Sequence, residues 1–439
     1  MNRRFNSLFS APWVSRVLIL LGFAGAVSLA ACEEKLEAGA ACPVLCPGVH
    51  DVQLQDTTIE AVAVDSTIAG FPDIGAEEPL LLAARGDTLD TRVIFRFDTI
   101  GKTYTHPSAP ADSFVTHIDS ATLRIVLDTN TLVGVLPLPT APVTIEMYDV
   151  DSPADTTAAD LVPLFDQPNR FLGSKTFAAE SLLKDTLFLP VSPAAVLDKI
   201  TNGTHLRIGL RLRSATQSTQ LRIWSSTAPA VLRFKPASDT AVTVGLISKT
   251  PSDTTLTTLR NNLADFVITA KGIAPPPSNT ISVGGFPAQR TYMRFDLPKH
   301  IVDSSTVVRA TLTFTQYPMP NSPSAQDSLG IYPFAITAGT ILTDVGKLVR
   351  LATINTAIVA DSLRVIPAGS GTRRLELVNL VRVWRNTKAE QTQRALVLAV
   401  GREGSNPAIA SFFSSDATDP SVRPRLQLTY VPQVTLGLP

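Results

Sequence analysis

Basic side chains at alternating positions are the clearest candidates for chemistry in this sequence. In the first half they lie between apolar residues along two stretches of the chain: Arg92, Arg96, His205, Arg207, Arg211 and Arg213. Because successive side chains of a β-strand point to opposite faces, each stretch would place its basic groups on one face. Guanidinium groups pair with carboxylates in a bidentate fork, so two such strands could form a cationic face for a carboxylated or sulfated polysaccharide.

A shorter version occurs in the second half, where Tyr292 stands between Arg290 and Arg294. An aromatic ring flanked by guanidinium groups could stack on a sugar while the arginines bind its acid group. The alternative, which we favour, is that the arginines of both halves face solvent and pair across strands with acids such as Asp98 and Asp296. Exposed pairs of that kind contribute little to stability or binding.

Acidic residues gather where Asp149, Asp151 and Asp155 follow one another closely. Their oxygens could bind a structural calcium ion, but the closing bidentate glutamate of a calcium loop is missing. We therefore favour an acidic solvated loop and predict no cofactor, with structural calcium left open.

Catalytic signatures are sparse. The chain has only five histidines, and it lacks the nucleophile elbow, the zinc-binding histidine pair, the phosphate-binding loop and the dinucleotide fingerprint. Tyr104 with His106 or His117 could act as the acid and base of a polysaccharide lyase. These residues lie in a segment with Pro and Ser that is typical of a surface loop. We predict that the protein is not an enzyme.

The N-terminus predicts export. Basic residues precede an apolar run at 17–27, which is typical of a secretory signal peptide over residues 1–31. The sequence Leu-Ala-Ala-Cys that ends at Cys32 resembles the lipobox of bacterial lipoproteins. This resemblance implies a diacylglyceryl group on Cys32 that anchors the protein to a membrane of the cell envelope, at the outer membrane or the cell surface.

Residues 32–50 are rich in Gly, Ala and Pro and predict a flexible tether behind the lipidated cysteine. Outside the cytoplasm, Cys42 and Cys46 would pair in a disulfide across a very short loop. A metal site is disfavoured, because these two thiols and His50 do not complete a four-ligand shell.

A repeated phrase indicates duplication. The segment from Arg92 to Asp98 (RVIFRFD) returns as RTYMRFD at 290–296, and three further phrases follow each copy in the same order. Four collinear matches predict two modules, at residues 51–236 and 237–433.

Strand and turn signals dominate both modules. The chain has 33 Pro against 24 Gly, only four Met, and apolar residues that alternate with polar ones. A short helix is expected in each module, after Ser192-Pro193 in the first and along the face of Leu377, Leu380 and Trp384 in the second. We therefore predict an all-β fold of two tandem jelly-roll-type β-sandwich domains.

The ordered motifs R-x-x-x-R-F-D, A-T-L, an apolar segment ending in Trp384, and F-S-S before a closing strand resemble the bacterial and archaeal surface modules called DNRLRE domains. The resemblance implies a jelly roll displayed outside the cell as a non-catalytic attachment module. Part of that group is classed among carbohydrate-binding modules with a preference for alginate.

Three functions follow, in order of preference. The first is a non-catalytic envelope lipoprotein that binds an anionic polysaccharide or a surface matrix through its modules. The second is a structural or assembly lipoprotein that binds an envelope protein, and the third is a polysaccharide lyase. Nucleic acid is an unexpected partner, because 38 basic residues balance 38 acidic ones.

Overall fold

The computed structural model describes residues 54–59, 62–72, 74–86, 88–98, 100–108, 111–129, 139–153, 157–214, 219–249, 265–322, 325–338, 361–386 and 393–432. The predicted signal peptide 1–31, the tether 32–50 with Cys32, Cys42 and Cys46, and Asp155 lie outside these residues. Among the helices of the described ranges, none has the length and apolar character needed to cross a membrane.

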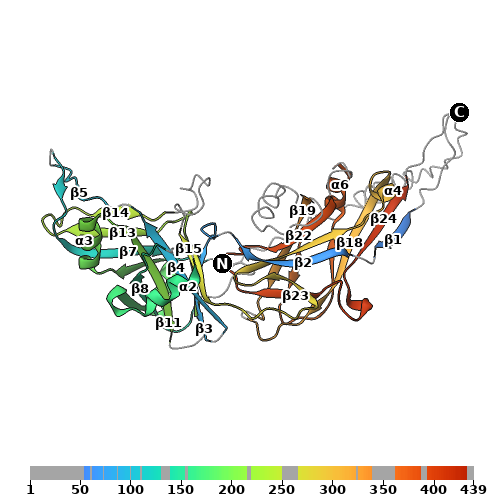
Figure 1. Ribbon diagram of the computed structural model, residues 1–439, viewed down its shortest axis with the longest axis horizontal. Helices are drawn as coiled ribbons and strands as arrows, with labels where there is room; N and C mark the ends of the chain where they lie inside the picture. Colours follow the sequence, from blue (N-terminus) through green and yellow to red (C-terminus); the bar gives the residue numbers. More distant parts are fainter. Residues whose placement is uncertain are drawn as a thin grey trace, which may run out of the picture. The chain divides into compact units, whose positions relative to one another are not determined.

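The first half of the chain folds into antiparallel sheets (Figure 1). A four-stranded sheet has the order β10-β7-β13-β14, from Thr186–Pro190, Ile118–Val126, Val231–Pro236 and Val244–Ile247. A second sheet has the order β12-β3-β4-β11-β8-β9, from Thr219–Ile223, Leu80–Arg85, Leu89–Phe97, Leu206–Ser214, Val143–Asp149 and Phe171–Phe177. Strand β15 (Phe266–Lys271) also pairs with β4, and β5 (Thr103–Tyr104) with β6 (Ser113–Phe114) forms a small hairpin.

The second half forms one curled sheet of eleven strands. Its path is β1-β24-β18-β23-β16-β17-β22-β19-β20, from Gln55–Ile59, Arg425–Pro432, Ser305–Tyr317, Ile409–Phe413, Thr280–Gly284, Ala288–Phe295, Gln393–Val400, Leu329–Ala338 and Leu363–Val365. Two strands pair off this path: β21 (Gly371–Glu376) with β18, and β2 (Val62–Phe71) with β17.

The two halves have the same strand pairing. The row β14-β13-β7-β10 matches β1-β24-β18-β21, and the row β12-β3-β4-β11-β8-β9 matches β23-β16-β17-β22-β19-β20. Even the link between the two rows recurs, as the bridge Leu127↔Ile223 in the first half and as the β18–β23 pairing in the second. This correspondence supports the duplication that the repeated motifs indicate.

The first strands of each repeat pair with the other repeat. Strands β1 and β2 begin the chain but pair with β24 and β17 of the second half. Strands β14 and β15 stand in the same place before the second repeat, and they pair with β13 and β4 of the first half. Strand pairing therefore crosses the boundary that the motifs predict between residues 236 and 237.

Each repeat has its own apolar core. The alternation in β4 places Val93, Phe95 and Phe97 in the core of the first half, and Met293 with Phe295 takes the same role in the second. The core in both halves thus rests on the repeated strand that the sequence motif marks.

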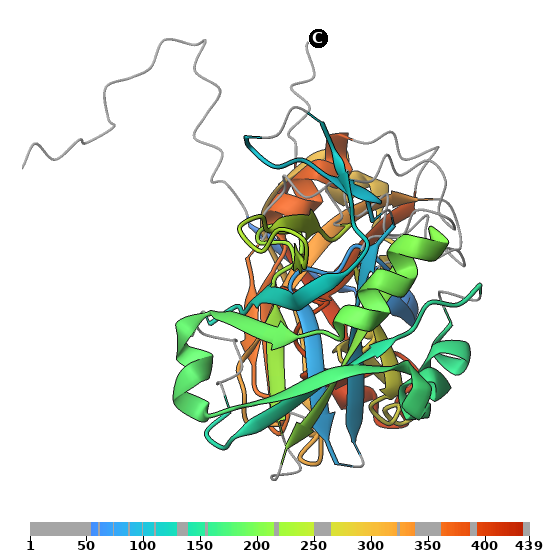
Figure 2. The same ribbon diagram turned by 90° about the vertical axis from the view of Figure 1, so that its left-hand side faces the viewer.

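One main helix packs in each half. Helix α3 (Pro193–Asn202) begins at Ser192, whose side chain accepts a hydrogen bond from Ala195 N, and ends at Gly203 with a positive φ. Figure 2 shows this helix against the strands of the first half, where it contacts β7. Helix α6 (Val378–Asn386) buries Trp384 completely in the second core.

The remaining helical segments are short. They are α2 (Ala158–Leu161), α4 (Lys299–Val302), and the 3₁₀ turns η1 (Val162–Asp166), η2 (Pro168–Arg170), η3 (Ala179–Lys184) and η5 (Pro420–Val422).

Candidate functional site

The predicted cationic face exists as a surface of the sheet, but other residues cover it. Arg96 on β4 lies directly opposite Arg207 on β11, so both side chains are on the same face. A second apolar cluster occupies that face, made by Ile94, Tyr148, Val150, Leu161, Leu164, Phe165, Phe266 and Ile268. Segment 158–166 therefore buries a face that the sequence suggested was open to solvent, and β15, which pairs beside β4 in the sheet, adds Phe266 and Ile268 to the cluster.

Phe165 is the centre of this covering cluster. Its side chain is fully buried, and its ring lies 5.5 Å from the Tyr148 ring. A Cβ atom at Gly209 would come within 2.4 Å of the Phe165 ring. Glycine at this interior strand position is thus what allows Phe165 to pack against the sheet.

Arg92 is part of the same packing. Its guanidinium lies over the Phe165 ring at 4.7 Å from the centroid, donates to the Val162 carbonyl at 3.0 Å and pairs with Asp90 at 3.0 Å. These partners hold the segment 158–166 on the sheet.

Arg211 forms the densest ionic network of the first half. It pairs with Glu146 and with Asp166, each at 2.8 Å, and donates to the Tyr148 hydroxyl at 2.6 Å. Burial raises the pKa of Glu146, but hydrogen bonds from Arg213 and Arg211 outweigh it and leave that pKa below its usual value. Arg213 itself remains 60% exposed while it contacts Glu146.

The other basic candidates of the first half, Arg96, Arg207 and His205, also have partners in the fold. Arg96 is 2% exposed and pairs with Asp98 at 3.4 Å. Arg207 is buried, donates to the Ser152 carbonyl at 2.9 Å and lies 3.6 Å from a carboxylate oxygen of Asp151. The imidazole of His205 contacts the backbone carbonyl of Asp98.

In the second half, too, a candidate arginine is paired within the fold. Arg290 binds Glu403 through two hydrogen bonds of 2.8 and 2.6 Å and lies over the Phe71 ring at 4.0 Å. Tyr292 is only 3% exposed, and burial raises the pKa of its hydroxyl. Arg294 is partly exposed on the same strand. A ring as buried as Tyr292 offers no face for a sugar to stack on.

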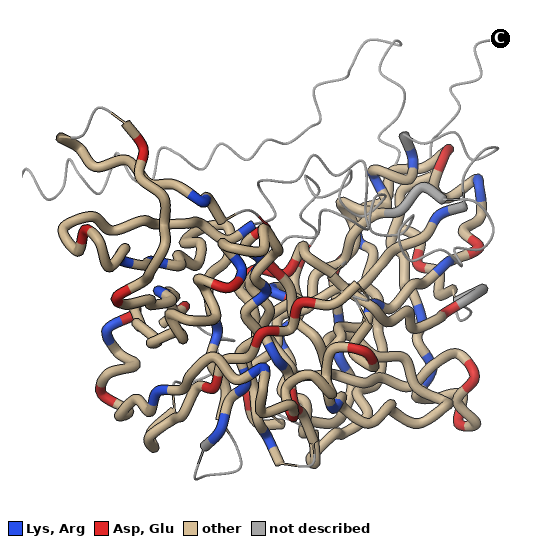
Figure 3. Tube along the Cα trace, turned by 60° about the vertical axis from the view of Figure 1, so that its left-hand side comes forward, with Lys and Arg blue, Asp and Glu red and all other residues tan. Residues whose placement is uncertain are grey.

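Basic and acidic residues are interspersed along the trace (Figure 3). The structure thus pairs the predicted stripe with acids, but Arg96 and Asp98 lie two residues apart along the chain and not on opposite strands, and Arg96 is buried and does not face solvent. The partners are more buried than a solvated sheet would make them, because segment 158–166 lies over them. Ligand binding by these arginines stays a prediction. Arg213 has the most exposed side chain among the paired arginines of the first half described above.

The acidic candidates for calcium are neutralised by cations. Lys199 Nζ lies 2.9 Å from Asp149 and 3.4 Å from Asp151. Across the described ranges, no group of three or more His, Cys, Asp or Glu side chains is arranged to hold a metal ion.

Two of the three residues considered for acid–base chemistry do come together. Tyr104 and His106 line an open pocket of about 590 Å³. The Tyr104 hydroxyl is 2.8 Å from Ser238 Oγ, and His106 Nε2 is 3.4 Å from Asp239 Oδ2. Because the Ser108 N–H donates to His106 Nδ1 at 3.1 Å, that nitrogen is unprotonated in neutral histidine and Nε2 carries the hydrogen. His117 is exposed and is not among the residues lining the pocket.

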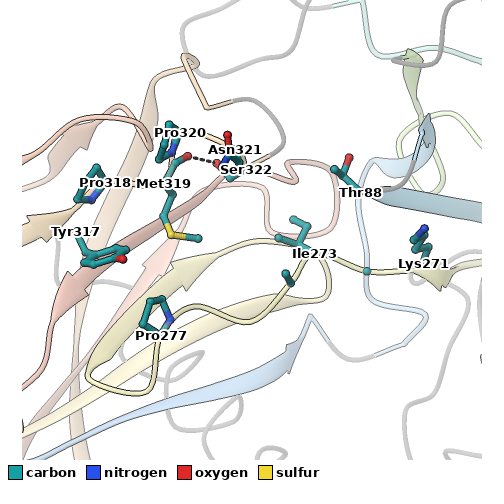
Figure 4. Close-up of a pocket in the computed structure, with 12 residues that line it drawn as sticks. Thr88, Lys271, Ile273, Pro277, Tyr317, Pro318, Met319, Pro320, Asn321 and Ser322 are labelled. Atoms are coloured by element: carbon teal, nitrogen blue, oxygen red, sulfur yellow. Dashed lines mark hydrogen bonds between the residues drawn. The ribbon is translucent and has the colours of Figure 1, made fainter.

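A larger groove lies beside the connection between β15 and β16. It holds about 720 Å³ and is lined by Thr88, Lys271, Gly272, Ile273, Ala274, Pro277, Tyr317, Pro318, Met319, Pro320, Asn321 and Ser322. We call it the Tyr317 groove. Figure 4 shows Tyr317 and Pro318 toward one end and Thr88 with Lys271 toward the other.

The walls of the Tyr317 groove are fixed by local contacts. The Tyr317 ring packs edge to face on Phe413, with centroids 5.5 Å apart. Met319 N donates to the Pro367 carbonyl at 2.9 Å, and Ser322 Oγ donates to the Met319 carbonyl at 2.9 Å (Figure 4). The signal in the sequence is Tyr317-Pro-Met-Pro, in which two exposed prolines flank a partly exposed methionine next to a tyrosine.

The two tryptophans in the described ranges differ in exposure. Trp384 is fully buried in the second core, as its helical face predicted, whereas Trp224 is partly exposed at the end of β12.

No family model matches this chain, and no curated protein matches it. Among solved structures, a "putative secreted protein" from Parabacteroides distasonis ATCC 8503 is similar over 85% of this chain and 99% of that chain, at 8% identity and a TM-score of 0.23. The Macrobrachium rosenbergii nodavirus structure is similar over 92% of this chain and 98% of that chain, at 10% identity and a TM-score of 0.17. Similarity at this level assigns the chain to no family and to no activity.

Proposed function

We propose that the protein is a non-catalytic envelope lipoprotein that binds an anionic polysaccharide in the Tyr317 groove. The observation that carries this proposal is the groove itself, whose mostly apolar lining includes a tyrosine, a lysine and an asparagine. Binding sites of this kind are concave, mostly apolar, and supplied with a few polar groups that orient the ligand. The Leu-Ala-Ala-Cys32 motif and the DNRLRE resemblance support the envelope location and the jelly-roll modules.

The groove matches the chemistry of a uronate polymer. Tyr317 is partly exposed, so its ring can contact the apolar face of a sugar while Phe413 holds its orientation. Lys271 supplies a positive charge for a carboxylate, and Asn321 is exposed and can bind hydroxyl groups. The groove thus replaces the arginine stripe as the first candidate, because most of the stripe's arginines are buried beneath segment 158–166.

Calorimetric titration of the mature chain with alginate and pectin oligosaccharides tests this assignment. We expect Tyr317→Ala to weaken binding about tenfold, which corresponds to about 1.4 kcal/mol, and Lys271→Met to remove most of the salt dependence of binding. Tyr332→Ala is the matched control, because Tyr332 is a 40% exposed tyrosine on β19 that does not line the groove.

Equal loss of affinity in the Tyr317 and Tyr332 variants would contradict the assignment. Binding that instead disappears with Arg213→Ala would return the site to the arginine stripe. If no polysaccharide binds and an envelope protein co-purifies with the chain, the assembly function takes its place.

The pocket at Tyr104 and His106 supports a second candidate, a polysaccharide lyase. Such a reaction removes the proton beside the uronate carboxylate, forms a carbon–carbon double bond, breaks the glycosidic bond and protonates the leaving oxygen. His106, oriented by Asp239 at Nε2, would take the proton at Nδ1 in place of the hydrogen bond from Ser108, and Tyr104 would protonate the leaving group. Unsaturated products from uronate polymers that vanish with His106→Ala would support this activity; their absence with the wild-type chain would exclude it for those polymers.

A further inference from the structure

We propose that a second copy of this chain can supply strands β1 and β2, so that the protein forms strand-exchanged dimers. The partner is the protein itself, and the contact surface is the one that β17 and β24 already present to β1 and β2 within a chain. The proposal is independent of polysaccharide binding.

The exchange of first strands is reciprocal and equivalent in the two repeats. Ser66 of β2 lies opposite Tyr292 of β17, and Phe266 of β15 lies opposite Ile94 of β4. Tyr292 and Ile94 hold the same place in the repeated motif, so β2 and β15 have the same register. Each repeat is therefore completed by strands from a second repeat, and that second repeat can belong to the same chain or to another.

Side-chain contacts make the acceptor specific for the incoming strands. Asp65 on β2 accepts hydrogen bonds from Ser415 N at 2.7 Å and from Ser415 Oγ at 2.8 Å. Asp265, at the equivalent position before β15, accepts from Arg96 N at 3.0 Å and from Ser225 Oγ at 3.5 Å. Both aspartates thus contact a repeated Ser-Ser pair, and they join the exchanged strand to the repeat that receives it.

The connections after the exchanged strands keep each repeat from completing itself. Pro72 and Pro79 lie between β2 and β3, and the run 275–277 between β15 and β16 consists of prolines. Proline has no amide hydrogen and a fixed φ, so these connections are stiff and cannot extend a ladder. A stiff connection disfavours the sharp reversal needed to lay a strand beside its own repeat, and short hinges of this kind favour exchange between chains.

A disulfide across the exchanged strand distinguishes the two arrangements. Thr58 of β1 and Gln427 of β24 are register partners and are both exposed, and residues directly opposite in an antiparallel pair are close enough to be bridged. The variant for this test combines Thr58→Cys and Gln427→Cys, and its Cys32, Cys42 and Cys46 are replaced by serine. It is refolded from urea at low and high concentration, oxidised, and run on a non-reducing gel.

We expect a disulfide-linked dimer whose share rises with concentration, and mixed isotope-labelled chains should yield a hybrid cross-linked peptide. Deleting residues 74–76 should raise the dimer share, and inserting a flexible six-residue linker there should lower it. An intrachain disulfide alone at every concentration, with the deletion variant also monomeric in light scattering, would overturn the proposal. An equal amount of dimer from the single-cysteine variants would overturn it as well.

Discussion

Replacing Gly209 by alanine tests whether Phe165 holds segment 158–166 on the sheet. The added Cβ would lie 2.4 Å from one Phe165 ring carbon and 2.8 Å from another, which is closer than such contacts occur. Overpacking of a well-packed core costs about 1–3 kcal/mol, and loss of a fully buried phenylalanine costs about 3–5 kcal/mol. We therefore expect Gly209→Ala to destabilise the first half by about 3 kcal/mol, between simple crowding and ejection of the ring.

The assay is urea unfolding of the mature chain, followed by circular dichroism and tryptophan fluorescence. Gly245→Ala is the matched control, because its new Cβ would meet nothing nearer than Val231 at 3.8 Å, and we expect a change within about 0.5 kcal/mol. A double-mutant cycle with Phe165→Ala should show a coupling energy of about 2 kcal/mol, since the clash disappears with the ring. A Gly209→Ala chain as stable as the wild type, or strictly additive effects in the cycle, would refute this account of the packing.

Two further predictions concern charged groups. Asp65→Ala removes both hydrogen bonds to Ser415, and we expect a loss of about 1–3 kcal/mol together with faster amide hydrogen exchange in β2; unchanged exchange there would contradict the role given to Asp65. The folded-state pKa of Glu146 is lowered, because hydrogen bonds from Arg213 and Arg211 outweigh the effect of burial. Its stabilisation is therefore present above the unfolded pKa of about 4.3 and is lost as the pH falls through the folded pKa. Urea unfolding midpoints measured at neutral and acid pH should fall less on acidification in Arg211→Ala than in the wild type. A wild-type dependence of the midpoint on pH in that variant would count against the network.

Local patterns predicted much of the secondary structure. The N-cap at Ser192, the positive-φ glycine at 203 and the buried helical face of Trp384 are set by neighbouring residues along the chain. Alternation likewise predicted which side of β4 holds Phe95. Such features depend on a few sequential positions, so they can be read from the sequence.

The covering of the arginines was not predictable in the same way. It depends on Phe165 meeting Gly209, two residues from different segments whose contact leaves no periodic signal. The sequence does contain a mostly apolar run at 161–165, but it follows an acidic stretch that is typical of a solvated loop. The Tyr317 groove and the pairing partners of β2 and β15 are missed for the same reason, because only the tertiary fold brings their residues together.

The pairing of β1 with β24 sets the order in which the protein can be completed during synthesis. Thr429 Oγ1 donates to Asp56 Oδ1 between residues 373 positions apart, so the earliest strand made waits for nearly the last one. Contacts of such long sequence separation form slowly. During synthesis β1 therefore has no partner strand until β24 has been made, and its backbone hydrogen-bonding groups stay unpaired for most of translation.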